Sequence, residues 1–323
     1  MITIPRINIA HLPTPVEALP RLTAELGGPK IIVKRDDLTG LAFGGNKTRK
    51  LEFLLAEAQA NGARTIITAG AVQSNHCRQT AAAAARHNFD CILVLSGEKP
   101  AKATGNLLLD CLFNAEIVWC GREERDSVLQ QTFQKAWEAG KRPYLVPYGG
   151  SNTTGATAYV FAMQELLNQA CRPDWVVFAS SSGGTQAGLV TGARIFGFAG
   201  KILGISVDEP AMVLKTGVAN LATATADALR ENASFEPAHI LVNDEYRGEG
   251  YGIMGTGEIE AIRMFARLEG LLLDPVYTGR AAAGMIDLIR KGYFNQQEMV
   301  LFWHTGGTPA IFSEQYAGIA RPI

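Results

Sequence analysis

Short apolar runs alternate along the chain with longer segments in which apolar residues recur every three or four positions. The short runs are typical of strands buried on both faces, and the longer pattern is typical of helices with one buried face. The expected strands are 30–34, 65–69, 91–95, 116–119, 144–147, 175–179, 201–207, 239–242 and 299–303. The expected helices are 48–60, 75–86, 104–113, 123–139, 154–170, 185–196, 256–268 and 280–290.

This alternation predicts an α/β fold built from βαβ units with mainly parallel sheets. At roughly 150 residues per domain, a chain of 323 residues makes about two domains. No flexible linker separates two halves of the sequence, so we expect one domain to be inserted into the other. In such folds ligands bind where the carboxyl ends of strands meet the N-termini of helices.

Composition and charge narrow the class of protein. The residues are 47% hydrophobic and 19% charged, with a formal net charge of −1, which indicates a globular protein without a basic surface for nucleic acid. The first ten residues lack the pattern of a secretory signal, and Arg194 interrupts the apolar run 187–200, which is too short to span a bilayer. The five cysteines form no C-x-x-C pair. We therefore expect a cytoplasmic protein that binds neither membranes nor nucleic acids.

Glycine is enriched, with 34 residues, and it occurs as adjacent pairs at 27–28, 44–45, 149–150, 183–184 and 306–307. Adjacent glycines allow a sharp turn or a close approach of the backbone to a ligand. All pairs except the first lie at strand-to-helix junctions or just before a helix. Two of them resemble nucleotide loops but fail the pattern, because Asn46 precedes Lys47 in one and Thr185 replaces a required glycine in the other.

Three junctions carry candidate chemistry. Lys47 follows Gly-Gly-Asn at a helix start and is either a solvated lysine or a Schiff-base lysine whose pKa is lowered there. Ser74 or Asn75 is either a plain N-cap or part of a helix N-terminus that binds a carboxylate. The small residues 180–185 follow a strand and precede a helix, as in a phosphate cradle.

Taken together, the motifs resemble the D-cysteine desulfhydrase / 1-aminocyclopropane-1-carboxylate deaminase family of pyridoxal-phosphate enzymes, over residues 5 to about 316. The matching segments are Lys-Arg-Asp-Asp at 34–37, Gly-Gly-Asn-Lys-Thr-Arg-Lys-Leu-Glu at 44–52, Gln-Ser-Asn-His at 73–76, Gly-Gly-Ser-Asn at 149–152, Asp-Pro-Val-Tyr-Thr-Gly at 274–279 and His-Thr-Gly-Gly at 304–307. The resemblance implies fold type II, with two open, parallel-rich sheet domains and pyridoxal 5'-phosphate in the cleft between them. We expect a large domain of residues 1–47 plus 160–323 and a small inserted domain of residues 48–159.

The resemblance also implies roles for individual residues. Lys47 matches the Schiff-base lysine, Ser74 matches a residue that contacts substrate and moves a proton, and Tyr277 and Tyr251 match tyrosines that face the substrate. Tyr277 is expected to have a lowered pKa beside the cofactor and to assist departure of the leaving group. The other expected cofactor ligands are Lys50, Asn75, Ser182, Gly183, Gly184, Thr185, Thr278 and Thr305, and the substrate carboxylate is expected at Ser74, Asn75 and His76.

Two positions bear on the reaction. Deaminases of this family carry Glu and Leu where this chain has Thr278 and Thr305, and the threonine pattern is similar to that of desulfhydrases. The expected reaction is β-elimination from D-cysteine, the expected partner is a small amino acid, and the expected assembly is a homodimer. The alternatives are L-cysteate sulfo-lyase, then 1-aminocyclopropane-1-carboxylate deaminase, and a non-catalytic α/β protein that binds a small molecule. Met254, where the family usually has Pro, leaves the substrate choice open.

Overall fold

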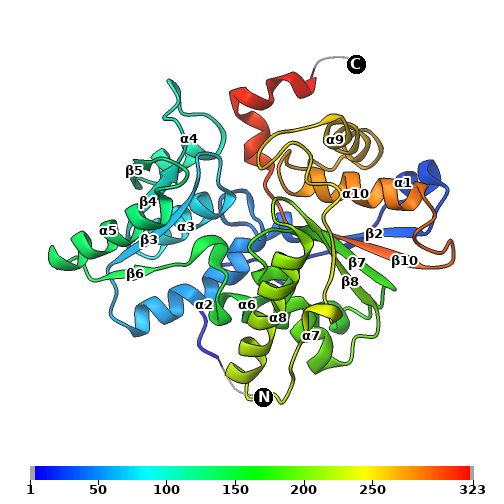
Figure 1. Cartoon of the computed structure of the whole chain (residues 1–323), viewed down its shortest axis with the longest axis horizontal. Coiled ribbons are helices and arrows are strands. Elements are labelled where there is room, and N and C mark those ends of the chain that lie inside the picture. Colours follow the sequence, from blue (N-terminus) through cyan, green and yellow to red (C-terminus); the bar gives the residue numbers. More distant parts are fainter. Residues whose placement is uncertain (1–3, 321–323) are drawn as a thin grey trace.

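Two β-sheets organise the part of the chain that the computed structural model describes, residues 4–320 (Figure 1). The larger sheet has the strand order β1-β2-β10-β7-β8-β9, and its strands run parallel except for β1, which is antiparallel to β2. Its strands are β1 (Val16–Ala18), β2 (Lys30–Arg35), β7 (Trp175–Ser180), β8 (Lys201–Ser206), β9 (Leu241–Asn243) and β10 (Met299–His304). The α/β class with parallel-rich sheets is thereby confirmed.

The smaller sheet is wholly parallel and has the order β5-β4-β3-β6. Its strands are β3 (Thr65–Ala71), β4 (Asp90–Ser96), β5 (Glu116–Cys120) and β6 (Pro143–Leu145). The chain enters this sheet after β2 and returns to the larger sheet at β7, so one sheet is inserted in the sequence of the other. The exact domain limits, 48–159 for the small domain, stay a prediction.

Helices cover both faces of each sheet, as the continuous apolar runs of the strands require. On the larger sheet α1 (Pro20–Leu26), α9 (Thr256–Glu269) and α10 (Thr278–Arg290) pack on one face, and α6 (Thr153–Asn168) and α7 (Gly184–Phe196) pack on the other. On the smaller sheet α2 (Asn46–Ala60), α3 (Asn75–Arg86) and α4 (Gly105–Leu112) pack on one face, and α5 (Arg125–Glu138) packs on the other. Helix α2 also contacts α6, which joins the two halves.

Three elements were not expected from the pattern, namely β1, α1 and α8 (Ala211–Ala228). The first two span three and seven residues, too few for a period to show. Alanine and threonine dilute the apolar pattern of α8, which packs against α7 through Leu214, Val218 and Ala222. The expected strand 239–242 is wrong in part, because 237–239 form a 3₁₀ turn before β9. Within residues 4–320 no helix is long and apolar enough to cross a membrane.

Asp36, which follows β2, joins both halves of the molecule through one fully buried carboxylate. Arg49 of α2 donates to both of its oxygens, at 2.9 and 2.8 Å. Tyr159 of α6 and Trp303 of β10 donate to Oδ2 at 2.6 and 2.8 Å, and the Thr14 hydroxyl donates to Oδ1. Burial alone would raise the pKa of this carboxyl, but Arg49 holds the pKa below its usual value, so it stays ionised.

We predict that Asp36→Asn lowers the free energy of unfolding by about 3–5 kcal/mol, because it leaves the buried Arg49 guanidinium short of countercharge. The measurement is urea denaturation of the protein. Glu260→Gln is the control, since Glu260 pairs with Arg290 on the exposed surface, where such a pair contributes about 1 kcal/mol or less. Equal losses in the two variants would contradict the role of Asp36.

Candidate active site

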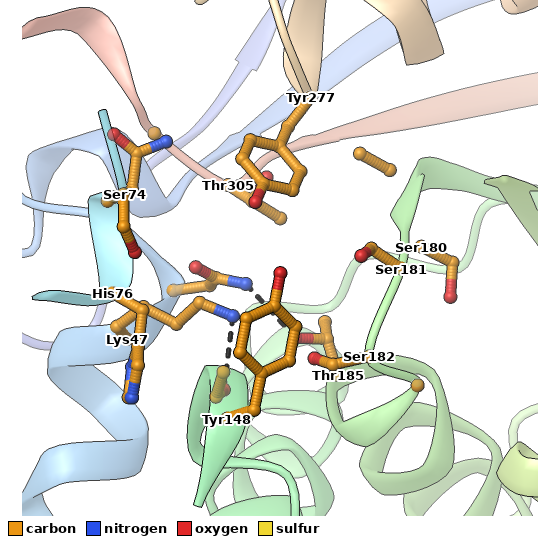
Figure 2. Close-up of a pocket in the computed structure, with 16 residues that line it drawn as sticks. Lys47, Ser74, His76, Tyr148, Ser180, Ser181, Ser182, Thr185, Tyr277 and Thr305 are labelled. Atoms are coloured by element: carbon orange, nitrogen blue, oxygen red, sulfur yellow. Dashed lines mark hydrogen bonds between the residues drawn. The ribbon is translucent and has the colours of Figure 1, made fainter. Parts of the chain in front are cut away.

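A pocket lies between the two halves and is lined almost wholly by the ends of elements (Figure 2). Its walls come from the N-termini of α2, α3 and α7, the start of α10, the segment after β10 and the 3₁₀ turn Tyr148–Gly150. Strand ends and helix N-termini therefore converge here, as the fold class predicts. Of the expected site residues, Lys47, Ser74, Asn75, His76, Ser182, Gly183, Thr185, Tyr277 and Thr305 line the pocket.

Lys47 reaches the pocket because the chain turns sharply between β2 and α2. Gly44 and Gly45 have φ values of 64° and 129°, and a Cβ on Gly45 would lie 3.1 Å from the Thr305 carbonyl oxygen. The turn puts Lys47 in the first turn of α2, where its Nζ donates to the Gly149 carbonyl at 3.1 Å. Burial lowers the pKa of Lys47 to about 8, which confirms the lowered pKa expected from its position.

Lys50 lies one turn further along α2 and is fully buried. Its Nζ donates to the same Gly149 carbonyl, at 3.1 Å. Burial, and then the charge of Lys47, lower the pKa of Lys50 well below its usual value. Because these two buried amines share one neutral acceptor, a bound anion would stabilise their positive charge.

The loop from β7 to α7 supplies a site for such an anion. Gly183 takes the left-handed conformation (φ 77°), and a Cβ on Gly184 would come within 2.5 Å of the Ser151 hydroxyl, so the loop requires glycine. The Ser182 and Ser151 hydroxyls are 2.8 Å apart, and the Asn46 amide donates to Thr185 Oγ1 at 3.1 Å. Backbone amides and hydroxyls at a helix N-terminus form an anion cradle, beside Lys47 and Lys50.

The N-terminus of α3 forms a second polar wall. Ser74 is the N-cap, and its hydroxyl accepts a hydrogen bond from the Cys77 amide, so the N-cap prediction is confirmed. The Asn75 side-chain oxygen accepts hydrogen bonds from Arg78 and Asn106, which orients its amide. His76 pairs through Nε2 with Thr68, and its Nδ1 has no hydrogen-bond partner among residues 4–320.

Two tyrosines face one another beside the pocket. Tyr277 lines it, and the Tyr277 and Tyr251 hydroxyls are 2.6 Å apart, with their rings edge to face. Burial, and then the neighbouring tyrosine, raise the pKa of Tyr277 well above its usual value. In the surroundings that the protein itself provides, Tyr277 is therefore a protonated donor at neutral pH, and the lowered pKa expected beside the cofactor stays a prediction.

Thr278 and Thr305, expected beside the cofactor ring, occupy different surroundings. Thr305 lines the pocket, and its carbonyl accepts from the Asn46 amide. The Thr278 hydroxyl instead donates to Asp274 Oδ1 at 2.7 Å, away from the lining. The Asp274 carboxylate also accepts the backbone amides of 276, 277 and 278, so it shapes the turn that presents Tyr277. Gly184 and Lys50 stand just behind the lining.

Sequence reasoning missed Tyr148, which lines the pocket opposite Tyr277 (Figure 2). The Arg125 guanidinium lies over its ring at 4.5 Å. The available signal was its position directly before the Gly-Gly-Ser-Asn motif. Among residues 4–320 no cluster of His, Cys, Asp and Glu could hold a metal ion.

Comparison with known proteins fits this geometry. The family model for pyridoxal-phosphate dependent enzymes matches residues 7–306. The chain belongs to this family. Among solved structures it resembles one described as an ACC deaminase homologue, at 37% identity and a TM-score of 0.88, over 96% of this chain and 94% of that one.

Two further structures share the fold, each at 15% identity and a TM-score of 0.66. One is a hydrogen sulfide-producing enzyme from Fusobacterium nucleatum, matched over 94% of this chain and 97% of that one. The other is a pyridoxal 5'-phosphate-dependent aspartate racemase, matched over 91% and 90%. The fold is therefore that of fold type II pyridoxal-phosphate enzymes, as predicted.

The residues present suit pyridoxal 5'-phosphate. Lys50 and the cradle at 182–185 would hold its phosphate. Lys47, with its pKa near 8, would hold the aldehyde carbon as a Schiff base, and the oriented Asn75 amide would contact the ring oxygen. When bound, the cofactor supplies an electron sink for charge that develops at the substrate Cα.

We predict that Lys47→Ala abolishes covalent attachment of the cofactor, because Lys47 supplies the amine. The purified variant should lack the visible absorbance of the holoenzyme, and borohydride followed by mass spectrometry should label Lys47 only in the parent. In the parent apoprotein, the rate of attachment should rise with pH around a midpoint near 8, since the neutral amine is the nucleophile.

Lys135→Ala is the matched control, because Lys135 is an exposed lysine of α5. It should take up cofactor as the parent does. Covalent attachment that survives in Lys47→Ala would show that another amine holds the cofactor.

Proposed function

We propose that the protein is a pyridoxal-phosphate-dependent lyase that eliminates the β-substituent of a small sulfur-containing amino acid. The substrate we propose is D-cysteine, which with water gives pyruvate, hydrogen sulfide and ammonia. The observation that carries the proposal is the lining of the pocket, which combines one reactive lysine with hydroxyl groups and, among the described residues, contains no carboxylate.

The missing carboxylate bears on the strength of the electron sink. A carboxylate beside the cofactor's pyridine nitrogen would keep that nitrogen protonated and strengthen the sink. This chain has Thr278 where the deaminases carry that carboxylate, and the Thr278 hydroxyl donates to Asp274 instead. Opening a cyclopropane ring needs a strong sink, because carbon is a poor leaving group. Sulfide leaves more readily, so a hydroxyl-lined pocket suits elimination of sulfur.

The chain's own residues can carry the remaining steps. The amides at the start of α3 bind the substrate carboxylate, as a helix N-terminus does for anions. Lys47 or Ser74 takes the Cα proton. The Cβ–S bond then breaks with its electron pair on sulfur, and the Tyr277 hydroxyl gives sulfur a proton that Tyr251 can replace across the 2.6 Å contact. The released 2-aminoacrylate is hydrolysed to pyruvate and ammonia.

Three other functions remain as alternatives. L-cysteate sulfo-lyase would use the same proton transfers with sulfite as the leaving group. 1-Aminocyclopropane-1-carboxylate deaminase is suggested by the name of the solved relative at 37% identity. A non-catalytic protein that keeps the fold and binds a small molecule would show no turnover at all. We also propose a homodimer in the cytoplasm, which cross-linking and cell fractionation can test.

We predict that the purified holoenzyme releases sulfide from D-cysteine at least tenfold faster than it releases sulfite from L-cysteate or 2-oxobutyrate from the cyclopropane amino acid, at about equal concentration. L-cysteine is included to test the enantiomer. Faster release of sulfite or of 2-oxobutyrate would replace D-cysteine as the proposed substrate. No turnover of any of these amino acids would favour the non-catalytic binding protein.

We predict that Tyr277→Phe lowers kcat by roughly 10²- to 10⁴-fold, because it removes the proton donor to sulfur. Cofactor absorbance should stay unchanged, since the phenol does not hold the cofactor. Tyr246→Phe is the control, because the Tyr246 hydroxyl pairs with Asp287 on α10 and does not line the pocket. An unchanged kcat in Tyr277→Phe would remove Tyr277 from the reaction.

A further inference from the structure

A second, larger cavity of about 1190 Å³ lies beside the pocket. One wall comes from the smaller sheet, through residues 96–104 and 119–125. The other comes from the segments 251–253 and 313–316. Tyr148 lines both this cavity and the inner pocket, so the two spaces adjoin at Tyr148, and this place is called the junction below.

Asp208, two residues beyond β8, stands at this junction. It lines the outer cavity together with Tyr148 and Tyr251. Its Oδ2 accepts a hydrogen bond from the hydroxyl of Ser181, which lines the inner pocket, at 2.9 Å. Tyr251 is hydrogen-bonded in the same way to Tyr277 of the inner pocket. A single hydrogen bond therefore links the Asp208 carboxylate to a residue of the inner pocket.

The hydrogen bonds that the Asp208 carboxylate accepts come from uncharged donors. Besides Ser181, the Glu209 backbone amide donates to Oδ1 at 3.1 Å. The side chain is only partly exposed, and burial raises its pKa from the usual value. Burial raises the pKa of Tyr148, and the charge of Asp208 raises it further, by more than Arg125 over the ring lowers it. Asp208 therefore places a negative charge at the junction, with the positive charges of Arg125 and Arg280 nearby.

The lining of the outer cavity as a whole carries charges of both signs. Its lining includes the basic residues Lys102, Arg122 and Arg125 as well as the acidic residues Glu98 and Glu314. Charges of both signs can therefore enter it. Selection by charge would therefore depend on the junction, where Asp208 is partly buried and an interaction between charges is less screened than at the exposed surface.

We propose that Asp208 makes the junction selective against amino acids whose side chain carries a negative charge. The neutral thiol of cysteine would be admitted, and the sulfonate of cysteate would be repelled. Rejection by an uncompensated like charge is a common way to obtain specificity. This inference rests on the proposed function, because it assumes that the site binds small amino acids. It adds that the side chain of the substrate carries no negative charge.

The test uses Asp208→Asn, which keeps the shape and the oxygen that accepts from Ser181 or Glu209 but removes the charge. Binding of asparagine and of aspartate to the holoenzyme, in both enantiomers, is measured by calorimetry, since this pair differs mainly in side-chain charge. The parent should bind asparagine at least about tenfold more tightly than aspartate, and Asp208→Asn should reduce that preference by about tenfold. An unchanged preference, or a parent that prefers aspartate, overturns the proposal.

Glu209→Gln is the matched control, because it removes the same charge from the exposed neighbouring residue. Its preference should stay within about twofold of the parent, since an exposed charge is screened. An equal loss in Glu209→Gln would assign the effect to net charge and overturn the role of Asp208. If Asp208→Asn loses cofactor, which its absorbance reports, Asp208→Ser replaces it in the same measurement.

The binding measurement is independent of which amino acid is turned over. If D-cysteine is not a substrate but the asparagine preference depends on Asp208, the proposed reaction fails and the inference about charge stands. If D-cysteine is the substrate and the preference does not depend on Asp208, the reaction stands and the inference fails.

Discussion

The buried Asp36 carboxylate is the interaction on which the arrangement of the site depends. It binds Arg49 of α2, Tyr159 of α6 and Trp303 of β10 at once, so it ties the end of β2 to elements of both halves. Lys47 lies two residues before Arg49 on the same helix. A buried charge must keep all of its partners, because an unpaired one is costly in a desolvated place. The position of Lys47 against the larger sheet is therefore set with little freedom.

Close approach of backbone segments to one another is a second constraint on the geometry of the site. Gly307 has no room for a Cβ, which would lie 2.7 Å from both the Asn75 amide nitrogen and the Asp274 carboxyl carbon. Gly149 is equally confined, with the Ser182 hydroxyl 2.4 Å from the position of a Cβ. Glycines at these places let three loops meet around one pocket. In the Gly27–Gly28 pair, away from the pocket, Gly27 ends α1 and a Cβ on Gly28 would lie 2.5 Å from the Ile289 side chain.

The electrostatics divide the site into two regions. On the cradle side, Lys47 and Lys50 are buried amines with lowered pKa values that share a neutral acceptor. On the entrance side, Tyr251 and Tyr277 have raised pKa values and lie in the field of Asp208. An anion is stabilised in the first region, and proton donors are kept in the second. This division suits a phosphate-bearing cofactor bound beneath a substrate that must lose a leaving group.

The sequence by itself determined the fold class, most strands and helices, and the residues that meet at the pocket, because strand ends and helix starts carry local signals such as Gly-Gly pairs and the Ser74 cap. It did not reveal α8, whose alanines blur the helical period, or the role of Tyr148, an ordinary aromatic outside its tertiary context. Only the tertiary structure decided that Thr278 turns to Asp274, that Tyr277 keeps its proton and that Asp208 stands at the entrance. The physical reason is that hydrogen-bond partners, desolvation and fields come from residues distant in sequence, which no local pattern encodes.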